Sequence, residues 1–342
     1  MPGRDATAQP DRTDDTAPPV PSEEVRQYFL DNPGDDTDGV SDMIVLRAQT
    51  REVGMRVRGE LQPIGATSDV VVRGVKVRTY QPLSIRRPDT CFLWIHGGGW
   101  MHGDLDVYEE VSRAFANELG CQVVAIDYGL APEYPFPFAL DQVWAVLQWA
   151  VDGFSQVVLA GDSSGANIAT AASIKARDAG VPVAVQLLIY PVLESSDKTD
   201  FKRRFRTRYS PFVGQANFGE STHERIKWIW DVYVPEGTMR ESALATPMRV
   251  DTLRGVAPAV IVTAEHDILR GEDEAYAERL RADGVSVELL NFPGQIHGFL
   301  QMRGVLSDAS AALSSAVAAV SSYLTPEPAR NAPAHPAQTK ES

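Results

Sequence analysis

The sequence has little cysteine, a deficit of positive charge and no long apolar run. Its 342 residues include only Cys91 and Cys121, too few for a disulfide framework, so we expect reduced thiols and a cytoplasmic protein. The 32 Lys and Arg residues against 46 Asp and Glu give a net charge of −14, which disfavours nucleic acid as a partner. The longest strongly apolar stretch, residues 181–193, is too short to span a bilayer.

Both ends of the chain also lack the patterns of folded structure. Residues 1–20 are polar, acidic and rich in proline, with no apolar segment typical of a secretory signal. Residues 325–342 consist largely of proline, alanine and charged residues without periodicity. We therefore predict a disordered N-terminal extension and a disordered C-terminal tail.

Between these ends, short apolar runs alternate with segments of helical spacing, which is typical of parallel strands joined by crossover helices. The fold class is therefore α/β. The predicted strands cover residues 69–73, 76–81, 91–95, 123–128, 157–160, 186–190, 260–264 and 287–292. The predicted helices cover residues 108–119, 139–151, 166–179, 274–283 and 305–324.

Residues 194–248 interrupt this alternation, because they contain no strand of the same kind. They hold a basic run, loop residues and an aromatic helix at residues 223–234. An insertion of this length is unusual for a simple connection, so we interpret it as a lid. Residues 23–55 are also helical in pattern, and we assign residues 21–60 to the lid. Residues 61–193 and 249–324 then form the catalytic domain.

A five-residue pattern, Gly161-Asp162-Ser163-Ser164-Gly165, lies between a predicted strand and a predicted helix. A serine on such a tight turn projects its hydroxyl above the edge of the sheet, and the glycines are needed where no side chain fits. Ser163 is therefore the candidate nucleophile. The alternative is a plain turn in which serine only caps a helix.

A serine hydroxyl needs a base within hydrogen-bond reach and a carboxylate that orients the base. Asp267 and His297 each follow a strand predicted to run parallel to the strand before Ser163, so all three lie at one sheet edge. Their chain order, Ser163, Asp267, His297, is that of the α/β-hydrolases. Glu265 and Asp273 are competing acids, but the register after the strand favours Asp267.

The segment His96-Gly97-Gly98-Gly99-Trp100 follows another predicted strand. Consecutive glycines let backbone N–H groups approach a substrate oxygen and stabilise the oxyanion of an acyl-transfer intermediate. We predict the N–H groups of Gly97, Gly98 and Ser164 as the donors, with His96 bracing the loop. The alternative is a flexible turn without a catalytic role.

These motifs resemble the hormone-sensitive-lipase-like branch of the α/β-hydrolases, a group of carboxylesterases and relatives. The resemblance covers roughly residues 65–325 and is carried by the segments at residues 96–99, 127–133, 161–165, 267–270 and 297–299. It implies an α/β-hydrolase fold, with a mostly parallel eight-stranded sheet flanked by helices and a helical lid. It also implies a serine esterase that cleaves a small or medium carboxylic ester through an acyl-serine, without metal or cofactor.

Two alternatives stay open at this point. An acyltransferase or cyclase could use the same three residues. A non-catalytic binding protein is the other alternative, since plant gibberellin receptors resemble this fold but replace the catalytic histidine position. The presence of His297 favours the enzyme. Whether the chain forms a homodimer is not decided by its sequence.

Two further groups of residues are candidates for contacts with substrate. The predicted pocket residues are Trp100, Trp228, Trp230 and Phe299. A basic run in the presumed lid is a candidate contact for an anionic substrate or an acidic carrier, although such a run is more often a solvated face. It consists of Lys202, Arg203, Arg204, Arg206 and Arg208.

Overall fold

The computed structural model describes residues 20–32, 40–196, 199, 222–235 and 237–325. Apart from Val20 and Thr325, the predicted terminal extensions lie outside the described residues. The basic run at residues 202–208 also lies outside them. The interpretations of these three segments therefore stay predictions.

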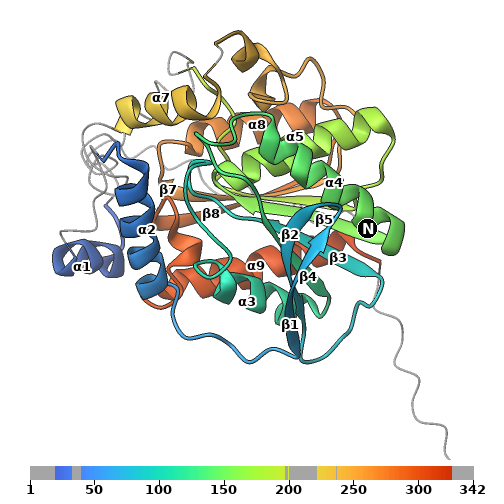
Figure 1. Cartoon of the computed structure of the whole chain (residues 1–342), viewed down its shortest axis with the longest axis horizontal. Helices are drawn as coiled ribbons and strands as arrows, with labels where there is room; N and C mark the ends of the chain where they lie inside the picture. Colours follow the sequence, from blue (N-terminus) through green and yellow to red (C-terminus); the bar gives the residue numbers. More distant parts are fainter. Residues whose placement is uncertain (1–19, 33–39, 197–198, 200–221, 236, 326–342) are drawn as a thin grey trace, which may run out of the picture.

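An eight-stranded sheet lies at the centre of the described structure (Figure 1). Its strands are β1 (Ala66–Val72), β2 (Val75–Gln81), β3 (Thr90–Ile95), β4 (Gln122–Asp127), β5 (Gln156–Asp162), β6 (Val185–Ile189), β7 (Ala259–His266) and β8 (Val287–Ile296). Their order across the sheet is β1-β2-β4-β3-β5-β6-β7-β8. Strand β2 is antiparallel to both of its neighbours, β1 and β4, and every other pair of adjacent strands, from β4 through β3 to β8, is parallel. The predicted mostly parallel eight-stranded sheet is confirmed.

Strand β3 shows why such short apolar runs form central strands. All six of its residues are buried, because both faces of the sheet are covered. Leu93 and Ile95 point into the apolar core on one face, whereas Phe92 and Trp94 point into the core on the other. A run of bulky apolar residues without polar alternation is therefore the expected pattern for this strand.

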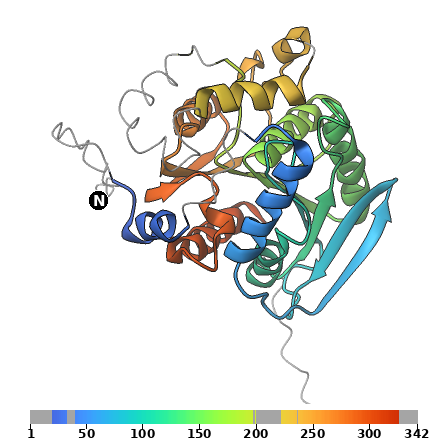
Figure 2. The same ribbon diagram turned by 60° about the vertical axis from the view of Figure 1, so that its left-hand side comes forward.

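Helices cover both faces of the sheet, as Figures 1 and 2 show. Helices α3 and α9 pack on one face, and α4, α5 and α8 pack on the other. The helices are α1 (Glu23–Asp31), α2 (Met43–Val57), α3 (Glu109–Leu119), α4 (Phe138–Gly153), α5 (Ser164–Ala179), α7 (Thr222–Tyr233), α8 (Arg270–Ala282) and α9 (Ser307–Tyr323). Short 3₁₀ turns are η1 (Gly237–Glu241), η2 (Pro247–Arg249) and η3 (Phe299–Gln301). None of the described helices combines the length and apolar character that crossing a membrane requires.

The predicted helical segment at residues 23–55 contains two helices, α1 and α2. Each begins at its own cap, because Ser22 Oγ accepts a hydrogen bond from the Val25 N–H and Asp42 Oδ1 accepts from the Ile44 N–H. The helix predicted from residue 274 begins earlier, at Arg270, directly after a turn in which the Arg270 N–H donates to the Asp267 carbonyl. These differences lie at helix ends, where local capping overrides periodicity.

Helix α2 is fastened to the loops at the carboxyl edge of the sheet by two arginines. Arg47 donates to the carbonyls of Met101 (2.8 Å) and Ala131 (3.0 Å) and forms a two-point ion pair with Glu133. Arg51 pairs with Asp104 and with Asp106. The N-terminal helices therefore contact the sheet edge, although the division into lid and catalytic domain stays a prediction.

Candidate active site

Ser163 is the single residue between the end of β5 and the start of α5. Its backbone has φ +51° and ψ −118°, a conformation that is costly for a residue with a side chain. The Ser163 N–H donates to the Ile189 carbonyl, which ties this turn to the neighbouring strand β6. The structure therefore contains the tight strand-to-helix turn that the sequence predicts.

The glycines on either side of Ser163 are required by close backbone contacts. A Cβ atom on Gly161 would lie 2.6 Å from the Gly165 carbonyl group and from the Ile95 oxygen. A Cβ on Gly165 would lie only 2.1 Å from the same Ile95 oxygen. Because these contacts are with backbone atoms, a side chain at either position would displace the turn or β3.

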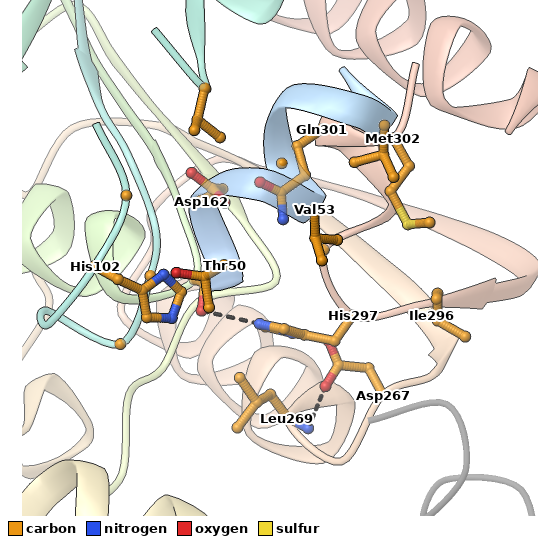
Figure 3. Close-up of a pocket in the computed structure, with 18 of the residues that line it drawn as sticks. Thr50, Val53, His102, Asp162, Asp267, Leu269, Ile296, His297, Gln301 and Met302 are labelled. Carbon is orange, nitrogen blue, oxygen red and sulfur yellow. Dashed lines mark hydrogen bonds and ion pairs between the residues drawn. The ribbon is translucent and has the colours of Figure 1, made fainter. Parts of the chain in front are cut away.

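Ser163, His297 and Asp267 form a continuous line of hydrogen bonds. His297 Nδ1 lies 2.6 Å from Asp267 Oδ2, and His297 Nε2 lies 2.9 Å from Ser163 Oγ. Because the carboxylate only accepts, Nδ1 carries the proton, and Nε2 is left to accept the serine hydroxyl. Asp267 is itself held by the Leu269 N–H, which donates to Oδ1 at 2.8 Å (Figure 3). The arrangement fits a serine nucleophile, a base and an orienting acid.

The protonation of His297 reflects two opposing effects. Burial is the largest single effect and lowers the pKa of its imidazole, but the charge and hydrogen bond of Asp267, together with the charges of Asp162 and Glu272, raise the pKa by more in total. The net result is a His297 pKa above its ordinary value of 6.5. A histidine with this pKa is well suited to take a proton near neutral pH and to release it again.

The glycine loop after β3 differs in one respect from the sequence-based prediction. The Gly97 N–H donates to Asp162 Oδ1 at 2.7 Å, so it is not free to bind a substrate oxygen, and the predicted role of Gly97 is wrong. Gly98 and Gly99 border the cavity at Ser163 and have φ values of +116° and +58°. A Cβ on Gly98 would lie 2.1 Å from the His102 carbonyl oxygen. The loop therefore needs glycine at this point.

Near Ser163, Gly98 and Gly99 border the cavity and Ser164 begins α5, so each can present a backbone N–H at the site. Ser164 is the first residue of α5, where a helix N–H has no carbonyl partner in the preceding turn. His96 supports the glycine loop. Its Nδ1 atom lies 2.7 Å from the Gly97 carbonyl oxygen, and its buried ring stacks on the ring of Tyr128. Burial lowers the pKa of His96, so the ring is neutral at neutral pH.

A cavity of about 750 Å³ opens at Ser163 and His297. Its walls include Val53 and Thr50 of α2 and Met302 after η3 (Figure 3). Ile229 of α7 also lines it. Side chains from α1 also border it. The two segments interpreted as lid thus both contribute to the wall around the site.

The four predicted pocket residues fall into two groups. Trp100 and Trp230 border the cavity, where Trp100 stacks on Tyr233 with ring centroids 4.1 Å apart. Trp228 and Phe299 are not among the residues that line it. Phe299 is fully buried against Phe292 and Tyr190, and the ring of Trp228 is covered by the Arg225 guanidinium. Those two side chains serve packing, contrary to the prediction.

His102 is a cavity residue that the sequence did not indicate. It borders the cavity from the glycine loop, and Figure 3 shows it among the side chains around the site. Burial, with a smaller effect of nearby positive charges, lowers its pKa to about 3, so it is neutral at neutral pH. No local pattern separates His102 from a solvated loop histidine, because its position depends on α2 packing over the loop.

The described residues contain no group of three or more His, Cys, Asp and Glu side chains that could hold a metal ion.

Comparison with known proteins decides the family. A family model described as alpha/beta hydrolase fold matches residues 92–301, which contain Ser163, Asp267 and His297. The chain belongs to the alpha/beta hydrolase fold family. Within this family it falls in the hormone-sensitive-lipase-like carboxylesterase group, and it is a carboxylic ester hydrolase.

Individual relatives agree with this placement in the alpha/beta hydrolase family. The chain is 37% identical over 259 residues to the carboxylesterase NlhH of Mycobacterium tuberculosis, covering 72% of this chain and 77% of NlhH. The solved structure of an esterase from Pyrobaculum calidifontis superposes with a TM-score of 0.77 at 29% identity, covering 89% of this chain and 99% of that one. The gibberellin receptor GID1A of Arabidopsis thaliana is 30% identical over 222 residues, 60% of this chain and 61% of the receptor.

Proposed function

We propose that Ser163 is the nucleophile of this hydrolase and that the substrate is a carboxylic ester of small or medium size. The observation that carries the proposal is the unbroken line of hydrogen bonds from Asp267 through His297 to Ser163, which ends at the cavity. Such a line activates a hydroxyl that is otherwise a poor nucleophile at neutral pH.

The reaction begins when Ser163 Oγ attacks the ester carbonyl carbon and His297 Nε2 takes the hydroxyl proton. Asp267 holds the imidazole in the required tautomer and stabilises the imidazolium. The N–H groups of Gly98, Gly99 and Ser164 donate to the oxyanion that forms on the carbonyl oxygen. His297 then gives the proton to the leaving alcohol, and the ester bond breaks to leave an acyl-serine.

Hydrolysis of the acyl-serine repeats the same steps with water. His297 Nε2 takes a proton from the water, whose oxygen attacks the acyl carbon, and then returns a proton to Ser163 Oγ as the carboxylic acid departs. Apart from the ester and water, the groups that take part in both halves of this proposed reaction belong to the chain. The apolar cavity walls suit the uncharged parts of an ester.

A fluorophosphonate probe tests the nucleophile. Ser163 Oγ is expected to attack the phosphorus and displace fluoride, so the intact mass rises by one phosphonyl group per chain. Peptide mapping should place the group on Ser163, and heat-denatured protein should stay unlabelled because the line of hydrogen bonds is lost. A folded protein that resists the probe would favour a binding role of the kind found in the gibberellin receptor.

The pH dependence tests the base. His297 must be neutral to accept the serine proton, so kcat/KM for a neutral ester is expected to be full above the His297 pKa and to fall as the pH decreases through it. Since this pKa is raised, the midpoint should lie above 6.5. A midpoint below 6.5 in the measured profile would contradict the assignment of His297 and its carboxylate partner.

Three finer points of the sequence interpretation stay proposals. A cytoplasmic location rests on the low cysteine content, and a homodimer is neither favoured nor disfavoured by the described residues. A contact of the basic run with an anionic substrate or an acidic carrier rests on charge alone.

A further inference from the structure

Asp162 is a buried carboxyl group that the proposed mechanism does not use. It is the last residue of β5, directly before Ser163, and only 2% of it is exposed. Its Oδ1 accepts the Gly97 N–H at 2.7 Å, and its Oδ2 accepts the Tyr108 hydroxyl at 3.1 Å. The side chain therefore joins the strand before the nucleophile to the glycine loop and to the residue before α3.

The hydrogen bond between Asp162 and Gly97 holds the glycine loop directly before the two residues that border the cavity at Ser163. The Gly97 N–H donates to Asp162, whose side chain borders the cavity, whereas the next two residues are the ones of the glycine run that border the cavity at Ser163. Further along, the Gly98 carbonyl accepts the N–H groups of Met101 and His102, which closes the loop into a turn. Asp162 is thus the anchor at one end of this turn.

The fit between Asp162 and Gly97 is close. A Cβ atom on Gly97 would lie 2.6 Å from Asp162 Oδ2. Only glycine lets the carboxyl group approach the backbone in this way, which explains why position 97 is glycine although its N–H does not face the substrate. The glycine run therefore contains one glycine that binds Asp162 and two that border the cavity.

We propose that Asp162 is a positioning residue that sets the distance between Ser163 Oγ and the N–H donors of Gly98 and Gly99. Because Asp162 and Ser163 are consecutive residues, a hydrogen bond from Asp162 to the loop couples the loop directly to the nucleophile. Preorganised donors stabilise the oxyanion only when they already lie at hydrogen-bond distance. This inference deepens the proposed function and rests on it.

The charge of Asp162 allows a second measurement, the pKa of His297. Burial raises the pKa of Asp162 to about 7, against the opposing effects of the Gly97 N–H, the Tyr108 hydroxyl and His297. Its negative form in turn raises the pKa of His297. The other titratable groups that interact with it are Tyr128 and Tyr190, whose pKa values burial raises well above 10 and which stay neutral. Replacing Asp162 with an uncharged residue should therefore lower the His297 pKa.

Two variants separate anchoring from simple packing. Asp162→Ala removes the acceptor of the Gly97 N–H, whereas Asp162→Asn keeps an acceptor oxygen for Gly97 and presents its amide group to the Tyr108 oxygen. For a neutral short-chain ester, we expect Asp162→Ala to lower kcat by ~10²-fold or more with KM changed less than about threefold. Asp162→Asn should stay within about tenfold of the wild-type kcat, with the acid limb of its pH profile at lower pH.

A trifluoromethyl ketone gives the decisive measurement. Ser163 Oγ adds to its carbonyl carbon, the carbonyl π bond becomes the oxyanion, and the proton passes to His297, so the adduct needs the same N–H donors as the reaction. We expect the inhibition constant in Asp162→Ala to rise in proportion to the loss of kcat/KM. An unchanged kcat, an increase in KM alone, or equal damage in the Asn and Ala variants would overturn the proposal.

Two controls distinguish a failure of the Asp162 proposal from a failure of the proposed function and from a loss of folding. If the wild-type chain hydrolyses no ester, the proposed function fails, and the affinity for the ketone, measured calorimetrically, still tests whether Asp162 holds the donors. If Asp162→Ala does not fold, as judged by circular dichroism, the Asn variant decides: a loss of kcat of ~10²-fold or more, although an acceptor oxygen for the Gly97 N–H remains, contradicts the proposal.

Discussion

The variant Ser163→Ala is expected to lose ester hydrolysis by roughly 10⁴-fold or more in kcat while keeping its fold. The loss is large because Ser163 is the only group in the line of hydrogen bonds that forms a bond to the acyl carbon in the proposed mechanism. Initial rates with a neutral ester, together with a thermal unfolding curve, provide the measurement. Retention of more than a tenth of the wild-type rate would remove Ser163 from the role of nucleophile.

A second substitution at the same position separates chemistry from stability. The φ of +51° is unfavourable for alanine as for serine, whereas glycine adopts it without strain. Ser163→Gly should therefore be equally inactive but more stable than Ser163→Ala, by about 1 kcal/mol or more in the free energy of unfolding. If the two variants unfolded at the same temperature, the turn would not be strained as the backbone indicates.

The parts of the fold that the sequence predicted are those determined by local pattern. The buried strands could be found because a strand covered on both faces needs a continuous apolar run, as in β3. The turn at Ser163 could be found because Gly161 and Gly165 leave a visible spacing around it. The meeting of Ser163, Asp267 and His297 at one edge of the sheet could then be predicted, because each follows one of the parallel strands.

The errors concern contacts between segments far apart in the chain. Gly97 was predicted to be a donor to substrate, since nothing near it shows that the carboxyl of Asp162, 65 residues later, accepts its N–H. Phe299 was predicted to line the pocket, but β8 and Tyr190 enclose it.

Replacement of Asp267, the acid of the site, is expected to cause the second large loss of kcat. Asp267 receives two donors, the Leu269 N–H at Oδ1 and the His297 ring at Oδ2. In Asp267→Asn, the oxygen of the amide must face the Leu269 N–H, because two donors cannot face each other. The amide N–H then faces His297 Nδ1, and the ring is forced into the tautomer that carries its proton on Nε2. That nitrogen can no longer accept the serine proton, so we expect kcat to fall by ~10⁴-fold.

Glu265→Gln is the matched control, since it makes the same change of carboxylate to amide two residues away. Glu265 accepts the Gly294 N–H and makes no hydrogen bond to His297 among the described residues, so its variant should stay within about threefold of the wild-type kcat. Steady-state rates of both variants with one neutral ester, measured above the wild-type acid limb, provide the comparison. Equal losses would place the orienting acid elsewhere. A large loss confined to Asp267→Asn would show that this carboxylate sets the tautomer of His297, because the two substitutions remove the same charge at nearly the same place in the chain.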